Sequence, residues 1–236
     1  MDCNDVEQAY DHCARTYDED HSSHASWEVT AVEEIVVLSL LRHIRFNDVL
    51  DAATGTGRYA VRLAQMGKRV VGIDVNEQML ERARVKAAQL GIDIEFQRAS
   101  VLAVPQADES VDLVICALAL GHVKDLATAV RELVRVLRCG GHLIISDLHP
   151  DIQKAWGPNY TMVVDGQEVP FPNYHGDIRE YLDSLDAAGA ELLAAIDVPM
   201  QQQRGLFPGP LVIFARKSDR GKVEPVVPTG ARAARA

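Results

Sequence analysis

Three histidines are candidates for the proton-transfer step of an enzyme, because histidine exchanges a proton near neutral pH. His122 in "LALGHV" and His149 in "ISDLHP" each follow an apolar run, and His175 stands in "FPNYHGD". We rank His149 first, because Asp147 stands two residues before it and is placed to fix the tautomer of its ring. Each histidine also has a structural interpretation: packing or helix capping for His122, a turn before Pro150 for His149, and a lid surface position for His175.

The stretch "VLDAATGTGRYA" has the composition of a nucleotide-binding loop between a strand and a helix. Its residues Gly55-x-Gly57-x-x-Ala60 satisfy the dinucleotide-binding fingerprint, with alanine in the last place. Asp74 ends the next strand-like run 17 residues beyond Gly57, where a carboxylate that binds ribose belongs. These residues alone are compatible with NAD, FAD or S-adenosylmethionine.

Asp51 favours S-adenosylmethionine among these three ligands. A carboxylate at the end of the first strand would repel the pyrophosphate of NAD, whereas it would attract the ammonium and sulfonium groups of S-adenosylmethionine. The chain also has no Tyr-x-x-x-Lys pair, which a single-domain reductase would use. An NAD(P)-dependent oxidoreductase and a catalytically silent binding protein with the same fold are the alternatives.

The elements that must position these residues alternate along the chain from residue 48. Short apolar runs predict five strands, at Asp48–Ala52, Arg69–Asp74, Ile94–Gln97, Val111–Ala117 and His142–Asp147. Apolar residues at helical spacing predict the helices between them, at Arg58–Met66, Glu77–Leu90 and Asp125–Leu137, the last ended by "CGG". Strands that alternate with helices predict an α/β fold: a Rossmann-like, doubly wound, mostly parallel sheet.

Segments on either side of this alternation predict additions to the sheet. Residues 1–45 are expected to form N-terminal helices that cap it. An inserted hairpin lid is predicted within residues 151–176, because Asp165-Gly166 separates two β-prone runs. The lid would then cover the carboxyl ends of the strands, where ligands of such sheets bind.

The C-terminal part of the chain completes the domain, which we expect to span residues 46–217. An amphipathic helix ends at Gly189, and two more strands are predicted at Glu191–Val198 and Leu211–Lys217. Residues 218–236 lack a periodic apolar face, so they are predicted to be a disordered tail.

Composition argues against several partners and settings. The formal net charge of -10 is unfavourable for a nucleic-acid surface, which needs clustered lysine and arginine. No apolar run approaches the roughly 18 residues of a membrane span, and the acidic N-terminus is unlike a secretory signal. Four cysteines without a C-x-x-C pair fit a reducing, cytoplasmic setting. The stretch "DEDHSSH" is interpreted as a solvated loop, so no metal site is expected.

Several further motifs stand in order along the chain: "AYDHCARTYD", "VVGIDVNEQMLERAR", "VPQADESVDLVICALALGHV" and "ELVRVLRCGGHLIISDLHP". Together with the glycine-rich stretch, they make residues 8–217 similar to the class I S-adenosylmethionine-dependent methyltransferases. The resemblance is greatest to the small-molecule group that includes the ubiquinone and menaquinone methyltransferases. It implies S-adenosylmethionine as the cofactor and methyl transfer as the reaction.

The resemblance also implies roles for individual residues. Asp51, Gly55 and Gly57 match the loop that passes the amino-acid end of the cofactor, and Asp74 matches the acid that accepts both ribose hydroxyls. The remaining matches surround the adenine and the methionine portion: Val75, Met79, Ser100 and Val101 beside the adenine, the carbonyl of Ala117 at the ammonium group, and Tyr17 over the methionine portion.

Three residues depart from the family's pattern. Ala53 stands where the first glycine is usual, so a methyl group must fit under the loop. Ser100 replaces an aspartate that binds the adenine amine, and a serine oxygen can still accept that bond. Cys139 replaces the proline of an "R-P-G-G" turn. The ribose acid and the two central glycines are kept, so we expect at most an altered affinity for the cofactor.

The segment after Pro150 suggests the kind of acceptor. It is rich in aromatic and apolar residues, namely Trp156, Tyr160, Met162, Val163, Val164, Phe171 and Tyr174. This composition suits a planar aromatic or lipophilic acceptor better than a highly charged one. We expect the methyl group to go to oxygen rather than to carbon. The same residues could instead pack on their own domain or across the interface of a homodimer.

Overall fold

The computed structural model describes residues 10–11, 25–151, 159–164, 167–172, 174–198, 200–202, 205–207 and 209–218 of the chain. Tyr17, the Asp165-Gly166 turn of the predicted hairpin and nearly all of the predicted tail lie outside these residues. No helix in the described part of the chain has the length and apolar character needed to cross a membrane.

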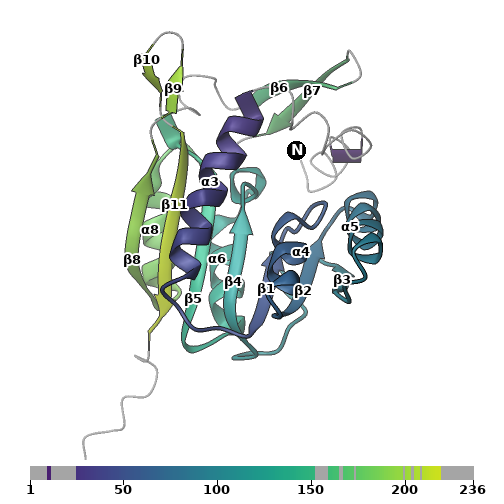
Figure 1. Ribbon diagram of the computed structural model, residues 1–236. Coiled ribbons are helices and arrows are strands. Elements are labelled where there is room, and N and C mark those ends of the chain that lie inside the picture. The colour runs from purple at the N-terminus through teal and green to yellow at the C-terminus, as the bar shows by residue number, and fades with distance from the viewer. Residues whose placement is uncertain are drawn as a thin grey trace, which may run out of the picture.

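A seven-stranded sheet forms the centre of the molecule, in the order β3-β2-β1-β4-β5-β11-β8 (Figure 1). Its strands are β1 (Asp48–Ala52), β2 (Arg69–Asp74), β3 (Glu95–Arg98), β4 (Val111–Ala117), β5 (Leu137–Leu148), β8 (Ala190–Asp197) and β11 (Pro210–Lys217). The first five in this order are parallel, whereas β11 is antiparallel to both of its neighbours. This confirms the predicted α/β class and the mostly parallel, Rossmann-like sheet.

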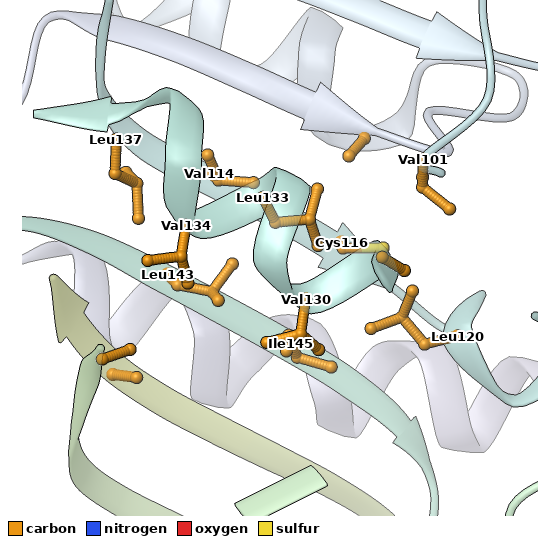
Figure 2. Packing of buried hydrophobic residues seen from close by; sticks show 14 of the residues in the cluster. Val101, Val114, Cys116, Leu120, Val130, Leu133, Val134, Leu137, Leu143 and Ile145 are labelled. Carbon is orange, nitrogen blue, oxygen red and sulfur yellow. The ribbon is translucent and has the colours of Figure 1, made fainter. Parts of the chain in front are cut away.

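Helices cover both faces of the sheet, and each face has its own hydrophobic core. Helices α3 (Ala25–Leu41) and α4 (Arg58–Gln65) pack on one face through residues such as Val37 and Leu63. Helices α6 (Leu126–Val136) and α8 (Ile178–Ala187) pack on the other. Figure 2 shows the side chains of α6 against those of β4 and β5 in this second core.

The boundaries of the elements follow the sequence predictions closely, with one exception. Strand β5 begins at Leu137 and not at His142, because the backbone turns directly from α6 into the sheet. The "CGG" stretch therefore lies within the strand, where the pairing with β4 shifts register and Gly140 has a φ of 75°. A glycine at positive φ is what such an irregularity needs.

The glycine-rich stretch connects β1 to α4, and a third helix packs against it. Gly57 is the N-cap of α4 and has a φ of 81°, which favours glycine. A Cβ atom added to Gly57 would lie 3.0 Å from the Cβ of Ala83 in α5 (Glu77–Gln89). The absence of a side chain at Gly57 thus lets α4 and α5 approach each other.

The predicted hairpin forms from β6 (Asn159–Val164) and β7 (Gln167–Pro172), which are antiparallel. It lies at the end of the sheet where the parallel strands finish (Figure 1). A second, shorter hairpin of β9 (Met200–Gln202) and β10 (Gly205–Phe207) was not predicted. Three-residue strands of mixed polarity give too short a pattern to recognise in the sequence.

Candidate functional site

A cavity of about 530 Å³ opens beyond the carboxyl ends of the parallel strands. This is where an open α/β sheet binds its ligands. Eight residues that the sequence assigned to the cofactor line it: Ala53, Gly55, Asp74, Val75, Met79, Ser100, Val101 and Ala117. Asp51 and Gly57 support the glycine-rich loop from behind and are not among the lining residues.

Asp74 joins the end of β2 to the glycine-rich loop. Its Oδ2 atom accepts a hydrogen bond from the backbone N–H of Gly55 at 2.8 Å, and its Oδ1 atom accepts one from the N–H of Asn76 at 2.9 Å. These bonds fix the plane of the carboxylate. Each carboxylate oxygen can accept more than one hydrogen bond, so both can still receive the two hydroxyls of a ribose.

Asp51 is buried behind the loop, with 2% of its surface exposed. Its Oδ2 atom accepts hydrogen bonds from Thr54 Oγ1 at 2.6 Å and from the N–H of Ala60 at 2.8 Å. Burial raises the pKa of Asp51 to about 6, although the bonds from Thr54 and Ala60 oppose the shift. Asp51 therefore ties the loop to the first turn of α4 and places a negative charge behind it above pH 6.

The backbone of the cavity wall is strained at two residues that carry side chains. Ala53 has a φ of 56° and Leu118, directly after β4, has a φ of 54°. The left-handed conformation costs a residue with a side chain roughly 1–2 kcal/mol. Such conformations concentrate at functional sites. The alanine in place of the first glycine is thus accommodated, at the cost of this strain.

The part of the cavity where the sequence predicts the adenine is largely apolar. Met79 and Val101 are almost fully buried, with 2% and 6% of their surfaces exposed, and Val75 lies beside them. Ser100 Oγ accepts a hydrogen bond from the N–H of Leu102 at 3.1 Å. A hydroxyl has a second lone pair and a proton, so Ser100 can also bind a polar group in the cavity.

The opposite end of the cavity was largely missed by the sequence analysis. It is lined by Tyr10, Leu118, Ala119, His122, Val123, Lys124, Asp125 and Tyr174. Six of these residues lie in the segment that follows β4, so the end of a parallel strand is the signal that could have identified them. Tyr10 and Tyr174 come from distant parts of the chain, and no local pattern relates them to β4.

His122 ends a short 3₁₀ helix, η1 (Leu120–His122), and is the candidate histidine that lines the cavity. Its Nδ1 atom lies 2.6 Å from the carbonyl oxygen of Pro172, the last residue of β7. A carbonyl only accepts, so Nδ1 carries the proton and a neutral ring has its lone pair on Nε2. The ring of Tyr10 lies nearby in a T-shaped arrangement, with 5.9 Å between the ring centroids.

His149 lies outside the residues that line the cavity. Its Nδ1 atom accepts a hydrogen bond from the N–H of Asp151 at 3.1 Å. Our prediction that Asp147 orients His149 is wrong, because the carboxyl of Asp147 bonds to residues of η1 and α8 and not to His149. Its Oδ2 atom accepts from the N–H of Gly121 at 2.5 Å and from the hydroxyl of Tyr181 at 2.8 Å. The turn after β5 thus ends the strand alternation on which the prediction rested.

His175 is buried, with 5% of its surface exposed, and does not line the cavity. Its Nε2 atom lies 2.6 Å from the carbonyl oxygen of Val123, and its Nδ1 atom lies 2.7 Å from Glu180 Oε2. Both ring nitrogens therefore face acceptors of the protein itself. A surface position, the structural interpretation given for this histidine, is also wrong.

Comparisons with known proteins identify the domain that holds this cavity. Residues 50–145 match a family model described as "Methyltransferase domain". A demethylmenaquinone methyltransferase of Thermus thermophilus is 39% identical over 116 residues, which cover 48% of this chain and 53% of that protein. The corresponding protein of Bacteroides fragilis is 31% identical over 152 residues, which cover 61% and 60%. Residues 50–145 therefore form a methyltransferase domain.

Solved structures confirm the fold of this methyltransferase domain. An S-adenosylmethionine-dependent methyltransferase of Methanosarcina mazei superposes with a TM-score of 0.65 at 20% identity, covering 76% of this chain and 96% of that one. One of Clostridium acetobutylicum gives 0.66 at 16% identity, covering 89% and 99%. The chain spans about a third to two thirds of the length of the curated relatives it matches.

The cavity of the methyltransferase domain fits the cofactor that belongs to this family, S-adenosylmethionine. Asp74 presents a carboxylate where the ribose is expected, and the adenine end offers apolar side chains. Among the lining residues, Lys124 is the single lysine or arginine, and it lies at the far end, after β4. Among the described lining residues, a pyrophosphate would therefore find no lysine or arginine beside the glycine-rich loop, whereas a sulfonium needs no cationic partner.

Within the part of the chain that the structure describes, no group of three or more His, Cys, Asp and Glu side chains is arranged to hold a metal ion. The "DEDHSSH" stretch lies outside the described residues.

Proposed function

We propose that this methyltransferase domain transfers the methyl group of S-adenosylmethionine to a small hydrophobic or phenolic acceptor, at oxygen rather than carbon. One observation carries the proposal: a single cavity joins the residues that suit the cofactor to a histidine whose tautomer is fixed. The whole protein's activity is part of the proposal, because the relatives named above are matched over part of their length.

The cofactor end of the cavity would bind and orient. Asp74 would accept both ribose hydroxyls, and Val75, Met79 and Val101 would flank the adenine. When bound, S-adenosylmethionine supplies a methyl group on a positively charged sulfur. The negative charge of Asp51 behind the loop favours a cation in the cavity. Tyr17 and the carbonyl of Ala117 stay predicted contacts of the methionine portion.

We assign His122 the role of general base for a hydroxyl acceptor. The carbonyl of Pro172 holds the proton on Nδ1, which leaves Nε2 to take the proton of the acceptor. The buried carboxyl of Asp147 lies close enough for its charge to interact with that of His122. Burial raises the pKa of Asp147, and the nearby His122 opposes that shift.

His149 and His175 rank below His122 in this assignment. His149 lies outside the cavity lining, and both ring nitrogens of His175 face groups of the protein. A general base must come within hydrogen-bond reach of the proton that it removes. Catalytic roles for His149 and His175 therefore need a rearrangement that brings their ring nitrogens into the cavity.

The environment of the acceptor end supports an apolar or aromatic acceptor. Leu118, Ala119 and Val123 provide apolar surface, and the rings of Tyr10 and Tyr174 lie beside them. Relatives named demethylmenaquinone methyltransferase make a quinone-like ring one acceptor to test. A cytoplasmic location, a homodimer and the lack of nucleic-acid binding stay predictions.

Ligand-dependent thermal stability tests the proposal. S-adenosylmethionine and S-adenosylhomocysteine should each raise Tm, because each binds the folded state only, whereas NAD and NADP should leave it unchanged. Transfer of labelled methyl groups to a panel of phenols, quinols and amines then identifies the acceptor class. Stabilisation by the nicotinamide cofactors alone would contradict the proposal, as would labelling of amines but no hydroxyl compound.

A further inference from the structure

We infer that Asp147 and His175 are positioning residues that hold the backbone on the two sides of His122. This inference rests on the proposed role of His122 as the base. We call Gly121, His122 and Val123 the base segment, of which His122 and Val123 line the cavity. Neither positioning residue lines the cavity, so each acts through the base segment.

Asp147 holds the first residue of the base segment. Its Oδ2 atom accepts the N–H of Gly121 at 2.5 Å, and its Oδ1 atom accepts the N–H of Leu148 at 2.9 Å. Asp147 stands near the end of β5 and is 6% exposed. A buried carboxylate is a strong acceptor, so the position of Gly121 is fixed to the central sheet.

His175 holds the last residue of the base segment. Its Nε2 atom donates to the carbonyl oxygen of Val123 at 2.6 Å, because a carbonyl can only accept. Its Nδ1 atom is 2.7 Å from Glu180 Oε2, on the first turn of α8. The imidazole thus connects Val123 to a helix of the core, across 52 residues of sequence.

Tyr181 connects the two positioning residues. Its hydroxyl donates to Asp147 Oδ2 at 2.8 Å, and its ring meets the ring of His175 edge-on, with 6.0 Å between centroids and an interplanar angle of 80°. The side chain is 1% exposed. The contacts from Gly121 through Asp147, Tyr181 and His175 to Val123 therefore close into a ring around the base segment.

The last residue of the hairpin, Pro172, and Tyr174 after it add two bonds to the same segment. The N–H of Tyr174 donates to the carbonyl oxygen of Gly121 at 2.8 Å, and the carbonyl of Pro172 accepts from His122 Nδ1. His175 directly follows Tyr174, so its bonds to Val123 and Glu180 also hold the carbonyl of Pro172 within hydrogen-bond distance of His122. Loss of His175 should disturb the tautomer and position of His122 while Asp74 and the adenine end stay in place.

Paired substitutions of His175 test the inference. The full chain carrying His175→Ala should lose about 10- to 100-fold in kcat, because a small displacement of a catalytic group has effects of that size. The Kd of S-adenosylhomocysteine should stay within about threefold of wild type. His175→Gln should recover most of kcat, because its amide N–H can still donate to Val123.

A spectroscopic measurement provides a readout that does not depend on turnover. Long-range ¹H–¹⁵N NMR of the histidine rings reports which nitrogen carries the proton, and the signals of His122 are assigned by their loss in His122→Ala. The wild type should show His122 protonated at Nδ1. His175→Ala should show a mixture of tautomers, and His175→Gln should show the wild-type pattern.

Three outcomes would overturn the inference. A folded His175→Ala variant could keep the wild-type kcat, or it could keep the wild-type tautomer of His122. The third outcome is an equal loss of kcat in His175→Ala and His175→Gln. If His175→Ala does not fold, Tyr181→Phe keeps the ring contact and removes the bond to Asp147, so it should lower kcat and leave the Kd unchanged. A His122→Ala variant with wild-type activity would refute the proposed base, whereas the NMR result on the positioning residues would still stand by itself.

Discussion

Asp74 Oδ2 accepts a hydrogen bond of 2.8 Å from the backbone N–H of Gly55, which ties the acid proposed to bind the ribose to the glycine-rich loop. The other carboxylate oxygen is fixed by the N–H of Asn76 at the start of α5. Asn76 in turn caps α5 through its own side chain and donates to Asp11 near Tyr10. The cofactor end is therefore preorganised by contacts between the ends of β1 and β2 and the N-terminal segment.

Asp74→Ala should weaken the binding of S-adenosylhomocysteine by about 30- to 150-fold, equivalent to roughly 2–3 kcal/mol for a lost pair of charge-assisted bonds. Calorimetric titration measures the change directly. Asp74→Asn is the matched control, because it keeps the size of the side chain and loses only the charge and one acceptor. It should fall between wild type and Asp74→Ala. Unchanged affinity in a folded Asp74→Ala would remove Asp74 from the ribose site.

Gly57→Ala should destabilise the fold by about 2–4 kcal/mol, because it adds a Cβ at a positive φ and 3.0 Å from Ala83 Cβ. Gly55→Ala is the matched control. Gly55 has a positive φ as well, but a Cβ there would meet no atom within 4 Å, so the cost should be about 1–2 kcal/mol. Urea unfolding of both variants measures the difference. Equal losses would show that the approach of α4 to α5 does not depend on Gly57.

The buried Asp51 should make the protein less stable as the pH rises from about 4 to 6. Its pKa is about 6 in the fold and 3.8 for an aspartate side chain free in water, so the folded state binds the proton more tightly. The stabilisation that protonated Asp51 contributes is complete at pH values below its pKa in the unfolded chain. It is lost as the pH rises through the pKa that Asp51 has in the folded protein. A shift of that size corresponds to at most about 3 kcal/mol.

Urea unfolding of wild type and Asp51→Asn across this pH range checks the effect. The difference between the two stability curves isolates Asp51, since other buried carboxyls such as Asp147 titrate in both proteins. Asp183→Asn, on the exposed side of α8, should follow the wild-type curve. Parallel curves for wild type and Asp51→Asn would mean that Asp51 keeps the same pKa in both states.

The cofactor end was predictable from the sequence because its residues are local. The glycine-rich loop and Asp74 are fixed by a strand, a turn and a helix that follow one another, and each has its own apolar pattern. The strands β1, β2 and β4 were predicted with the bounds that the structure has. Apolar runs between charged or glycine residues leave little freedom in where such strands begin and end.

The acceptor end was not predictable in the same way, because it is assembled from distant segments. His122 meets Pro172 across 50 residues and His175 meets Val123 across 52, and no period in the sequence relates them. The pairing of Asp147 with His149 failed for a local reason. Strand alternation places residues i and i+2 on one face, but the chain leaves the strand after Leu148.

The most direct test is a comparison of methyl transfer by His122→Ala, His149→Ala and the wild type, with S-adenosylmethionine and a phenolic acceptor. His122→Ala should lower the turnover rate by roughly 10²- to 10⁴-fold, the range expected for loss of a general base. Its Kd for S-adenosylhomocysteine should stay within about threefold of wild type. His149→Ala, outside the cavity lining, should turn over at nearly the wild-type rate. A His122→Ala rate within about threefold of wild type, or a large loss in His149→Ala alone, would contradict the assignment of His122 as the base.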